Sequence, residues 1–264
     1  MNKIAWLTDI HLNFLNELQI EEFCQTISAS NADAVLIGGD ISEAPQLEAH
    51  LRLLEKHLRQ PIYFVLGNHD FYRGSIQSVR RTAERISESS NQLKWLSNME
   101  VVELTEQTGL LGHDTWADGR SGAGAKSPIF LNDFMLIKEL RKSRNLFKTL
   151  GELGDEAAAY LKQQLPAALA RFQHLIVLVH VPPFIESCWH EGEISGDDWL
   201  PHFTCRAVGD TLRQIMNENP EKKMTVLCGH THSSGTAQIL SNLLVKTGAA
   251  KYGKPRVQEI LTIE

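Results

Sequence analysis

The chain lacks the segments that would place it in or across a membrane. No apolar run in its 264 residues approaches the length needed to span a bilayer. Met1-Asn2-Lys3 leads directly into a predicted strand, instead of the charged start and apolar stretch of a signal peptide. We therefore expect a cytoplasmic protein with no membrane partner.

Cysteine is scarce, and its spacing excludes the common cysteine-based sites. The chain has 4 cysteines, and no two of them form a C-x-x-C pair of the kind that holds zinc or makes a redox-active disulfide. Because disulfides are rare in the cytoplasm, we expect free thiols at Cys24, Cys188, Cys205 and Cys228.

An excess of basic residues is also missing. The formal net charge of -6 at pH 7 argues against generic nucleic-acid binding, which depends on Lys and Arg neutralising phosphates. Bound metal ions would add positive charge that this count omits, so nucleic acid is a possible but not favoured partner. No internal repeat, low-complexity tract or linker interrupts the chain. Its length suits one α/β domain with a buried core, and we expect a single domain over residues 1–264.

What the chain does contain is a set of short polar clusters, each placed where an apolar, strand-like run ends. In an α/β sheet the carboxyl ends of parallel strands open into one crevice, so ligands far apart in sequence can converge there. The clusters are Asp9 with His11, Asp40 after two glycines, Asn68-His69-Asp70, His180, and His230 with His232.

Imidazole and carboxylate oxygen bind divalent first-row metals without thiolates, so these clusters predict a site for manganese, iron, zinc or nickel, with manganese favoured. Asp9 and His11 are two residues apart, and on an extended segment they would point to the same side and grip one ion. The pair His230 and His232 repeats this spacing. Asp40 is the single acidic ligand of the middle strand and the expected bridge between two ions. Two ions roughly 3.5 to 4 Å apart activate a water and clamp a phosphoryl oxygen.

The ordered set resembles the calcineurin-like metallophosphoesterases, and the resemblance extends over nearly the whole chain. Its specificity lies in the order of the motifs, because a lone D-x-H or G-H-x-H is weak. The matching residues are Asp9-Ile10-His11, Gly38-Gly39-Asp40, Gly67-Asn68-His69-Asp70, Val179-His180 and Gly229-His230-Thr231-His232.

The resemblance implies a role for each of these residues. The first metal would be held by Asp9, His11, Asp40 and His232, and the second by Asp40, Asn68, His180 and His230. His69 would not be a ligand; in the family this histidine lies over the scissile phosphate, where it stabilises the phosphate or protonates the leaving oxygen. Asp70 would orient His69. The implied fold is a four-layer α-β-β-α sandwich with two mixed sheets.

The predicted function is metal-dependent phosphoester hydrolysis by a hydroxide that two metals activate. Asp40 is followed by Ile41-Ser42-Glu43, without the further aspartate and arginine of the family's protein Ser/Thr phosphatases, so the match is closer to the bacterial phosphodiesterases and small-molecule phosphatases. A diester substrate is favoured, because His69 with Asp70 could assist an alkoxide leaving group. One alternative is a nuclease. Another is a non-catalytic scaffold, although a scaffold should have lost several histidines that this chain keeps.

The stretches between the clusters predict helices and further strands. Amphipathic helices are expected at about 17–30, 46–58 and 73–90, two strands at 101–112, and two helices at 133–150 and 155–172 separated by Gly151 and Gly154. The last forty residues return to strand-like patterns.

Two loops are expected to determine substrate choice, because binding residues gather on loops. The first covers about 112–132, where Arg120 could grip a phosphate oxygen with its fork of donors and Asp118 could face the cleft. The alternative for this loop is a solvated surface turn. The second covers about 182–206 and follows His180 directly, so it could form a pocket wall, although its tryptophans favour simple packing.

Overall fold

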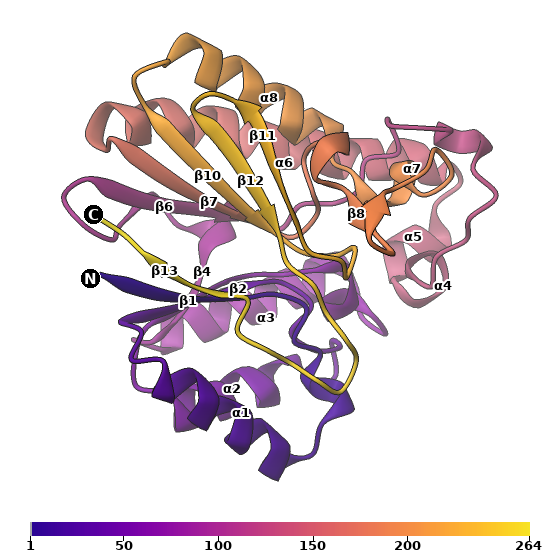
Figure 1. Ribbon diagram of the computed structural model, residues 1–264. Coiled ribbons are helices and arrows are strands. Elements are labelled where there is room, and N and C mark those ends of the chain that lie inside the picture. The colour runs from indigo at the N-terminus through magenta and orange to yellow at the C-terminus, as the bar shows by residue number, and fades with distance from the viewer. Residues whose placement is uncertain (1) are drawn as a thin grey trace.

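The computed structural model describes residues 2–264 as two β-sheets packed face to face, with helices outside both (Figure 1). The first sheet has the strand order β13-β1-β2-β3-β4. Its strands are β1 (Lys3–Leu7), β2 (Ala34–Gly38), β3 (Ile62–Val65), β4 (Leu93–Trp95) and β13 (Glu259–Thr262). Only β13 runs antiparallel to its neighbour, so this sheet is mixed.

The second sheet has the order β11-β12-β10-β7-β6-β5 and is also mixed. Its strands are β5 (Val102–Glu103), β6 (Thr108–His113), β7 (His174–Val179), β10 (Lys223–Cys228), β11 (Gly235–Leu240) and β12 (Leu243–Thr247). The central strands β6, β7, β10 and β12 are parallel, and β5 and β11 are antiparallel edges. A separate two-stranded ribbon joins β8 (Trp189–His190) to β9 (Glu193–Ile194).

Alternation along the strands builds the layers. Ile4 and Trp6 of β1 face the apolar core between the sheets together with Ile176 and Leu178 of β7, while Ala5 of β1 faces the helices on the other side. Successive side chains of a strand point to opposite faces of the sheet, so each strand contributes side chains to two hydrophobic cores. The predicted four-layer sandwich is therefore confirmed.

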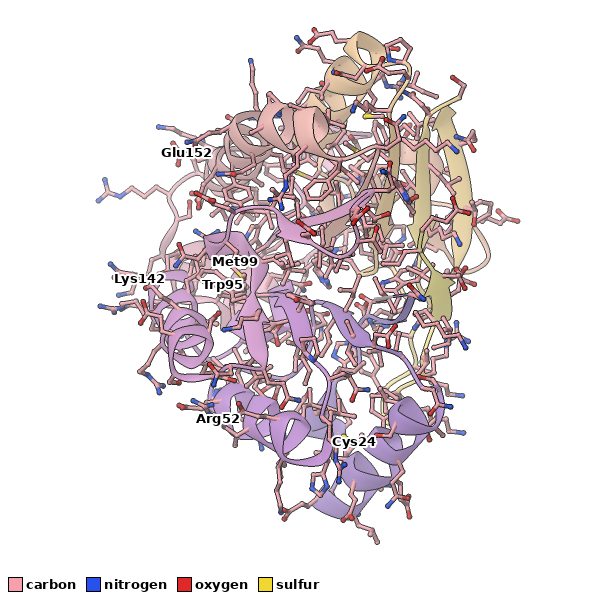
Figure 2. All side chains as sticks on the ribbon, turned by 90° about the vertical axis from the view of Figure 1, so that its left-hand side faces the viewer. Cys24, Arg52, Trp95, Met99, Lys142 and Glu152 are labelled. Carbon is pink, nitrogen blue, oxygen red and sulfur yellow. The ribbon has the colours of Figure 1, made fainter. Side chains whose placement is uncertain are left out.

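The helices lie on the two outer faces. The first sheet is covered by α1 (Glu17–Ala29), α2 (Leu47–His57) and α3 (Ile76–Ser89), and the second by α6 (Leu146–Arg171) and α8 (Arg206–Glu218). The first three match the predicted ranges closely. Seen from the side (Figure 2), side chains fill the space between the layers, and Arg52 of α2 and Glu152 of α6 lie at the outside.

The predicted break between two helices at Gly151 and Gly154 is wrong, because α6 runs through both residues. A Cβ at Gly154 would stand 2.6 Å from the Cβ of Asp118, and one at Gly151 would stand 3.3 Å from the Arg120 guanidinium. These glycines allow the loop of Asp118 to lie directly on the helix. Close packing thus overrides the cost of about 1 kcal/mol that each glycine carries relative to alanine in a helix.

Shorter elements lie in the two predicted loops and in other connections between the main helices and strands. They are α4 (Asp133–Leu136), α5 (Lys138–Lys142), α7 (Leu200–Phe203) and the 3-10 turns η1 (Leu12–Phe14), η2 (Asn68–Phe71), η3 (Leu96–Asn98), η4 (Gly124–Lys126) and η5 (Ile185–Ser187). The stretch 182–206 is therefore more ordered than a loop, because it holds η5, the β8–β9 ribbon and α7. The four cysteines are free, as predicted, and all four are buried. No helix within residues 2–264 is long and apolar enough to cross a membrane.

Candidate metal centre

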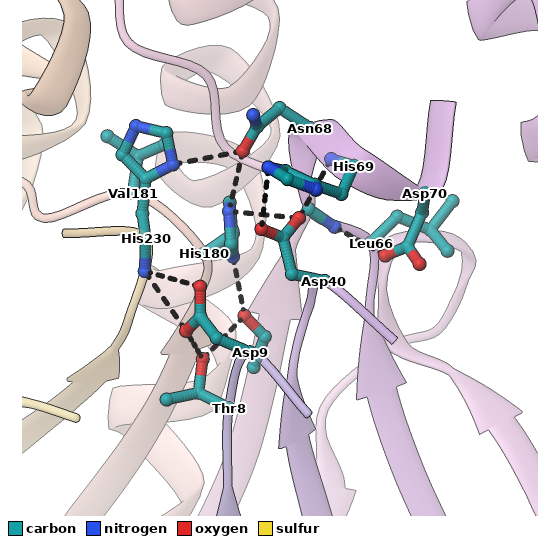
Figure 3. Close-up of polar contacts among 12 residues, drawn as sticks. Thr8, Asp9, Asp40, Leu66, Asn68, His69, Asp70, His180, Val181 and His230 are labelled. Carbon is teal, nitrogen blue, oxygen red and sulfur yellow. Dashed lines mark hydrogen bonds and ion pairs between the residues drawn. The ribbon is translucent and has the colours of Figure 1, made fainter. Parts of the chain in front are cut away.

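The polar clusters meet at one edge of the sandwich, where strands of both sheets end. Asp9, Asp40 and Asn68 follow β1, β2 and β3, which are parallel neighbours in the first sheet. His180 and His230 follow β7 and β10, which are parallel neighbours in the second. Figure 3 shows these side chains turned toward one another. Two sheets therefore contribute to one site.

The backbone at this edge is strained. Eight non-glycine residues within 2–264 have positive φ, and five of them are predicted ligands. Such residues persist only where the surrounding structure forces them, and they cluster at functional sites. The five are Asp9 (φ 50), His11 (φ 42), Asp40 (φ 51), His230 (φ 71) and His232 (φ 61).

The left-handed backbone contradicts the reason that the sequence suggested for pairing Asp9 with His11 and His230 with His232. We expected Asp9 and His11 to point to one side because the segment is extended, but both lie in the left-handed region of the backbone. The same holds for His230 and His232. The chain leaves each strand in a tight turn, and the turn brings the two side chains of each pair to the same region.

Four donor atoms form the first group. One atom from each of Asp9, His11, Asp40 and His232 lies within 4.8 Å of all the others. The Nε2 atoms of His11 and His232 are 3.2 Å apart, and His232 Nε2 is 3.5 Å from Asp9 Oδ1. Asp40 contributes Oδ2, which is 3.8 Å from His11 Nε2. Nitrogen and carboxylate donors at this spacing are suited to one divalent cation.

The second group centres on the side-chain oxygen of Asn68, which lies 3.0 Å from His180 Nε2 and 2.9 Å from His230 Nδ1 (Figure 3). His180 Nε2 is also 3.4 Å from Asp40 Oδ1. Asp40 thus directs one oxygen toward each group, as a bridging carboxylate must.

The protons in the second group leave its acceptor atoms facing one another. His180 donates its Nδ1–H to the Gly38 carbonyl (2.8 Å), and His230 donates its Nε2–H to the His202 carbonyl (2.9 Å). Burial lowers the pKa of His180 and takes that of His230 to about 3, so both rings are neutral near pH 7. The other ring nitrogen of each histidine then carries no proton, and its lone pair faces the side-chain oxygen of Asn68. Three acceptors at hydrogen-bond distance repel one another unless a positive ion lies between them.

Asp133 is a site residue that the sequence did not reveal. It lies at the start of α4, and its Oδ1 accepts hydrogen bonds from Asn68 Nδ2 (2.9 Å) and from the Tyr72 hydroxyl (2.6 Å). Because the amide nitrogen is held by Asp133, the amide oxygen must face the two histidines. Asp133 is 65 residues from Asn68, and no local spacing connects the two.

We expect Asp133→Ala to lower the affinity of a metal ion for the second group and to leave the affinity of the first group unchanged. The partner that orients a metal ligand commonly contributes 10- to 100-fold in affinity, so a loss of about that size is expected. Titration of metal into the metal-free variant, followed by calorimetry, measures it. Unchanged affinity for both ions would contradict the orienting role, and Asp197→Ala, at an exposed loop position, is the control.

His69 lies beside both groups without joining them. Its backbone N–H donates to Asp40 Oδ1 (2.8 Å), and its ring stacks on Tyr72 with 4.2 Å between centroids. Its side chain is 17% exposed toward the cavity described below. Burial lowers the pKa of His69 to about 3, so its ring is neutral near pH 7.

Asp70 does not contact the His69 ring, contrary to the predicted pairing. It is fully buried, and its carboxylate accepts backbone N–H groups from Ile41 (2.9 Å), Ser42 (2.8 Å) and Gly67 (2.8 Å). Figure 3 shows the Asp70 carboxylate apart from the His69 ring. Asp70 therefore ties the turn after β2 to the turn after β3, and it shapes the site through the backbone.

A cavity of about 230 Å³ opens beside the two groups. Tyr72, Asn132 and Tyr252 line it in addition to predicted site residues, and so do His190 and Phe203 of the 182–206 segment. The pocket wall expected from that segment is therefore present in part. Trp199 does not line this cavity but stacks on Phe203 with 5.0 Å between centroids, in keeping with the packing alternative.

A sequence model of the calcineurin-like phosphoesterases matches residues 2–234, which is most of the chain. The chain belongs to this family. The predicted resemblance is confirmed, and membership makes the protein a phosphoester hydrolase of a family that uses divalent metals. The first group described above, Asp9, His11, Asp40 and His232, is a candidate site for such a metal.

Solved structures of this calcineurin-like phosphoesterase fold agree with the architecture. The chain is similar to phosphopantetheinyl hydrolase from Mycobacterium tuberculosis, with a TM-score of 0.67 and 13% identity over 99% of this chain and 95% of that one. It is also similar to a dimetal phosphatase from Danio rerio, with a TM-score of 0.61 and 12% identity over 99% and 98% of the two chains. At such identities the similarity establishes the fold alone. No curated protein sequence matches this chain.

Arg120 and Asp118, expected at the substrate, do not line the metal cavity of this phosphoesterase within residues 2–264. Arg120 makes two 2.7 Å bonds to the carboxylate of Asp155 on α6 and donates to the Gly151 carbonyl (3.2 Å). Asp118 is buried and accepts from the Ala207 backbone N–H (2.9 Å). Both residues connect the 112–132 segment to α6 and α8, so their role here is structural. Buried Asp118 also differs from the solvated surface turn given as the alternative.

We expect Arg120→Ala to lower the melting temperature slightly and to leave kcat/KM unchanged. Asp155 is 63% exposed, and solvent screens such a pair, so a loss of at most about 1 kcal/mol is expected. Asp155→Ala should reproduce the shift, because it removes the same pair from the other side. A rise in KM for Arg120→Ala, with normal metal content, would instead place the arginine at the substrate.

Proposed function

We propose that this phosphoesterase hydrolyses small phosphodiesters or phosphomonoesters, with diesters favoured, by means of two divalent ions held by one bridging carboxylate. The first ion would be bound by Asp9, His11, Asp40 and His232, and the second by Asp40, Asn68, His180 and His230. Manganese is the favoured metal, with iron, zinc and nickel as the other candidates.

The observation that carries this proposal is the convergence of three acceptors in the second group. Neutral His180 and His230 direct bare nitrogens at the Asn68 oxygen at 3.0 and 2.9 Å, and Asp40 Oδ1 is 3.4 Å from the first of these nitrogens. The first group alone would support a mononuclear site. The second group, joined to it through Asp40, supports a binuclear one.

The residues around the two ions would then have separate roles. When bound, two divalent ions supply an activated water and charge that holds the phosphoryl oxygens. Asp40 fixes the separation of the two groups, and its Oδ1 also anchors the His69 backbone (2.8 Å). Neutral His69 can direct a ring N–H at a phosphoryl or leaving oxygen. The 230 Å³ cavity lined by Tyr72, Asn132 and Tyr252 receives the phosphate and its substituent.

Metal counting with activity tests the proposal. Protein stripped with a chelator and reloaded with manganese should contain two ions per chain by elemental analysis. It should hydrolyse methyl p-nitrophenyl phosphate, a simple diester, only when loaded. At most one ion per chain under saturating metal would overturn the binuclear assignment, and absence of hydrolysis of both diesters and monoesters with every candidate metal would overturn the activity.

A further inference from the structure

Two exposed aromatic rings, Phe14 and Tyr252, lie against each other, and Tyr252 lines the metal cavity. Phe14 ends η1, and Tyr252 belongs to the segment that joins β12 to β13 (Figure 1). Their centroids are 4.8 Å apart with planes inclined by 43°, and the residues are 52% and 46% exposed. Ordinary packing would bury such rings, whereas these two leave an apolar surface open to solvent.

This aromatic surface is continuous with the candidate metal site. Tyr252 lines the cavity, and its ring centroid lies 4.6 Å from that of His11 and 5.1 Å from that of His232. It is also 6.1 Å from the His69 ring. A substrate whose phosphate lies beside these histidines can therefore reach the exposed rings with its substituent. We call Phe14 and Tyr252 together the aromatic shelf.

Other exposed apolar side chains do not share these properties. Within residues 2–264, Leu18 is 64% exposed on α1 and Phe130 is 68% exposed, and neither lines the metal cavity. Phe14 does not line it either, but its ring packs against Tyr252, which does. Phe130 packs edge-on against Phe134, with 5.3 Å between centroids. Scattered exposed apolar residues are normal on a protein surface, whereas a pair of exposed rings in contact beside a phosphoester site indicates a ligand contact.

The charge around the shelf adds a preference for an anionic ligand. Lys251, Lys254 and Arg256 flank Tyr252 on the same segment and are exposed. Within residues 2–264 none of the three takes part in an ion pair, unlike Lys246, which pairs with Glu259 at 2.7 Å. On a chain with net charge -6 this is a local excess of positive charge next to an aromatic surface. Aromatic rings combined with free cations are the features that bind bases and their phosphates.

We propose that the aromatic shelf binds the planar base of a nucleotide substrate whose phosphate is held at the metal site. This inference rests on the proposed function and names its substrate class. The base stacks on Tyr252 and Phe14, and Lys251, Lys254 and Arg256 attract the negative charge of the nucleotide. Stacking of a base on an aromatic side chain contributes roughly 10- to 100-fold in binding.

Two esters with the same leaving group test the shelf. Thymidine 5′-(p-nitrophenyl phosphate) and methyl p-nitrophenyl phosphate release the same nitrophenolate, and only the first carries a base. The wild-type enzyme should prefer the thymidine ester by about 10- to 100-fold in kcat/KM. Phe14→Leu should reduce this preference, with the methyl ester slowed no more than about twofold, and Phe14→Leu with Tyr252→Leu should remove the preference. Leu18→Ala, an exposed apolar change outside the shelf, should keep the preference.

The cations are tested by salt dependence. Replacing Lys251, Lys254 and Arg256 by glutamine should flatten the fall in kcat/KM of the thymidine ester between low and physiological salt, because surface charges are screened over about 10 Å. The matched control replaces Lys56, Arg59 and Lys162, which are exposed and far along the chain, and should retain the wild-type slope.

The outcomes separate this inference from the proposed function. Metal-dependent hydrolysis of both esters at equal kcat/KM overturns the shelf and leaves the phosphoesterase proposal intact. If neither ester is hydrolysed with any metal, calorimetric binding of AMP against ribose 5-phosphate to the manganese-loaded protein tests the shelf directly. Tighter binding of AMP that the double variant abolishes supports the shelf, and equal binding overturns it.

Discussion

Asp40→Asn is expected to reduce kcat by about 10³-fold or more, because the two ions that Asp40 is proposed to bridge would contribute several kcal/mol to catalysis. An amide keeps the size of the side chain and one neutral oxygen, but it cannot bridge two cations as a carboxylate does. Asparagine also tolerates the left-handed backbone that Asp40 adopts at φ 51, so the turn after β2 should persist.

The stability of the metal-free variant distinguishes a metal role from a structural one. Burial raises the pKa of Asp40 well above its usual range, and the neighbouring carboxylates of Asp9 and Asp70 raise it further. Replacing Asp40 by a neutral amide relieves this repulsion. Metal-free Asp40→Asn should therefore melt at or above the melting temperature of the metal-free parent. The rise in melting temperature that we expect manganese to cause in the parent should be largely lost in the variant.

Asp198→Asn, at an exposed position, is the control for the Asp40 experiment and should match the parent in every measurement. Elemental analysis and thermal melting with and without manganese provide the readouts. If metal-free Asp40→Asn unfolds at a much lower temperature than the parent, the carboxylate supports the fold, and its catalytic effect could not be assigned to metal bridging.

His69→Asn should leave both metals bound and slow hydrolysis by about 10² to 10³, the usual effect of losing one donor that stabilises a developing negative charge. Burial lowers the pKa of His69 to about 3, so the ring is neutral near pH 7 and has no imidazolium proton to give. A neutral ring can still direct an N–H at a phosphoryl oxygen. We therefore expect alkyl and nitrophenyl esters to be slowed by similar factors.

The two ester types discriminate between the roles that the family resemblance left open for His69. A general acid matters most when the leaving oxygen is basic. A loss for the alkyl ester more than tenfold larger than for the nitrophenyl ester would identify His69 as the proton donor. Loss of a metal would make it a ligand instead. Tyr72→Phe, which keeps the ring beneath His69 but removes its hydroxyl, is a useful comparison.

The sequence by itself determined the order of the polar clusters and the fold around them. Asp9, Asp40, Asn68, His180 and His230 each follow an apolar run, and this pattern is local enough to be read directly. The amphipathic periods of α1, α2 and α3 are equally local, and the helices form nearly where they were predicted. With parallel strands, the meeting of the clusters at one edge follows from the fold class.

The tertiary structure decided what each side chain does at that edge. Asp70 was expected beside His69 because the two are adjacent in sequence, yet its carboxylate is held by backbone N–H groups of two different turns. Arg120 was expected at the phosphate because of its chemistry, but its partner Asp155 is supplied by a helix 35 residues away. Residue type limits the possible roles, and the available partner selects one of them.

The same reason explains the residues that only the structure revealed. Asp133 orients Asn68 across 65 residues, and Tyr252 reaches His11 from the far end of the chain. Helix α6 continues through Gly151 and Gly154 because a loop packs closely against it, which no helix propensity encodes. Periodicity and capping act over a few residues and are visible in the sequence. Hydrogen bonds, ring contacts and close packing join distant segments, so they are fixed only when the two sheets come together.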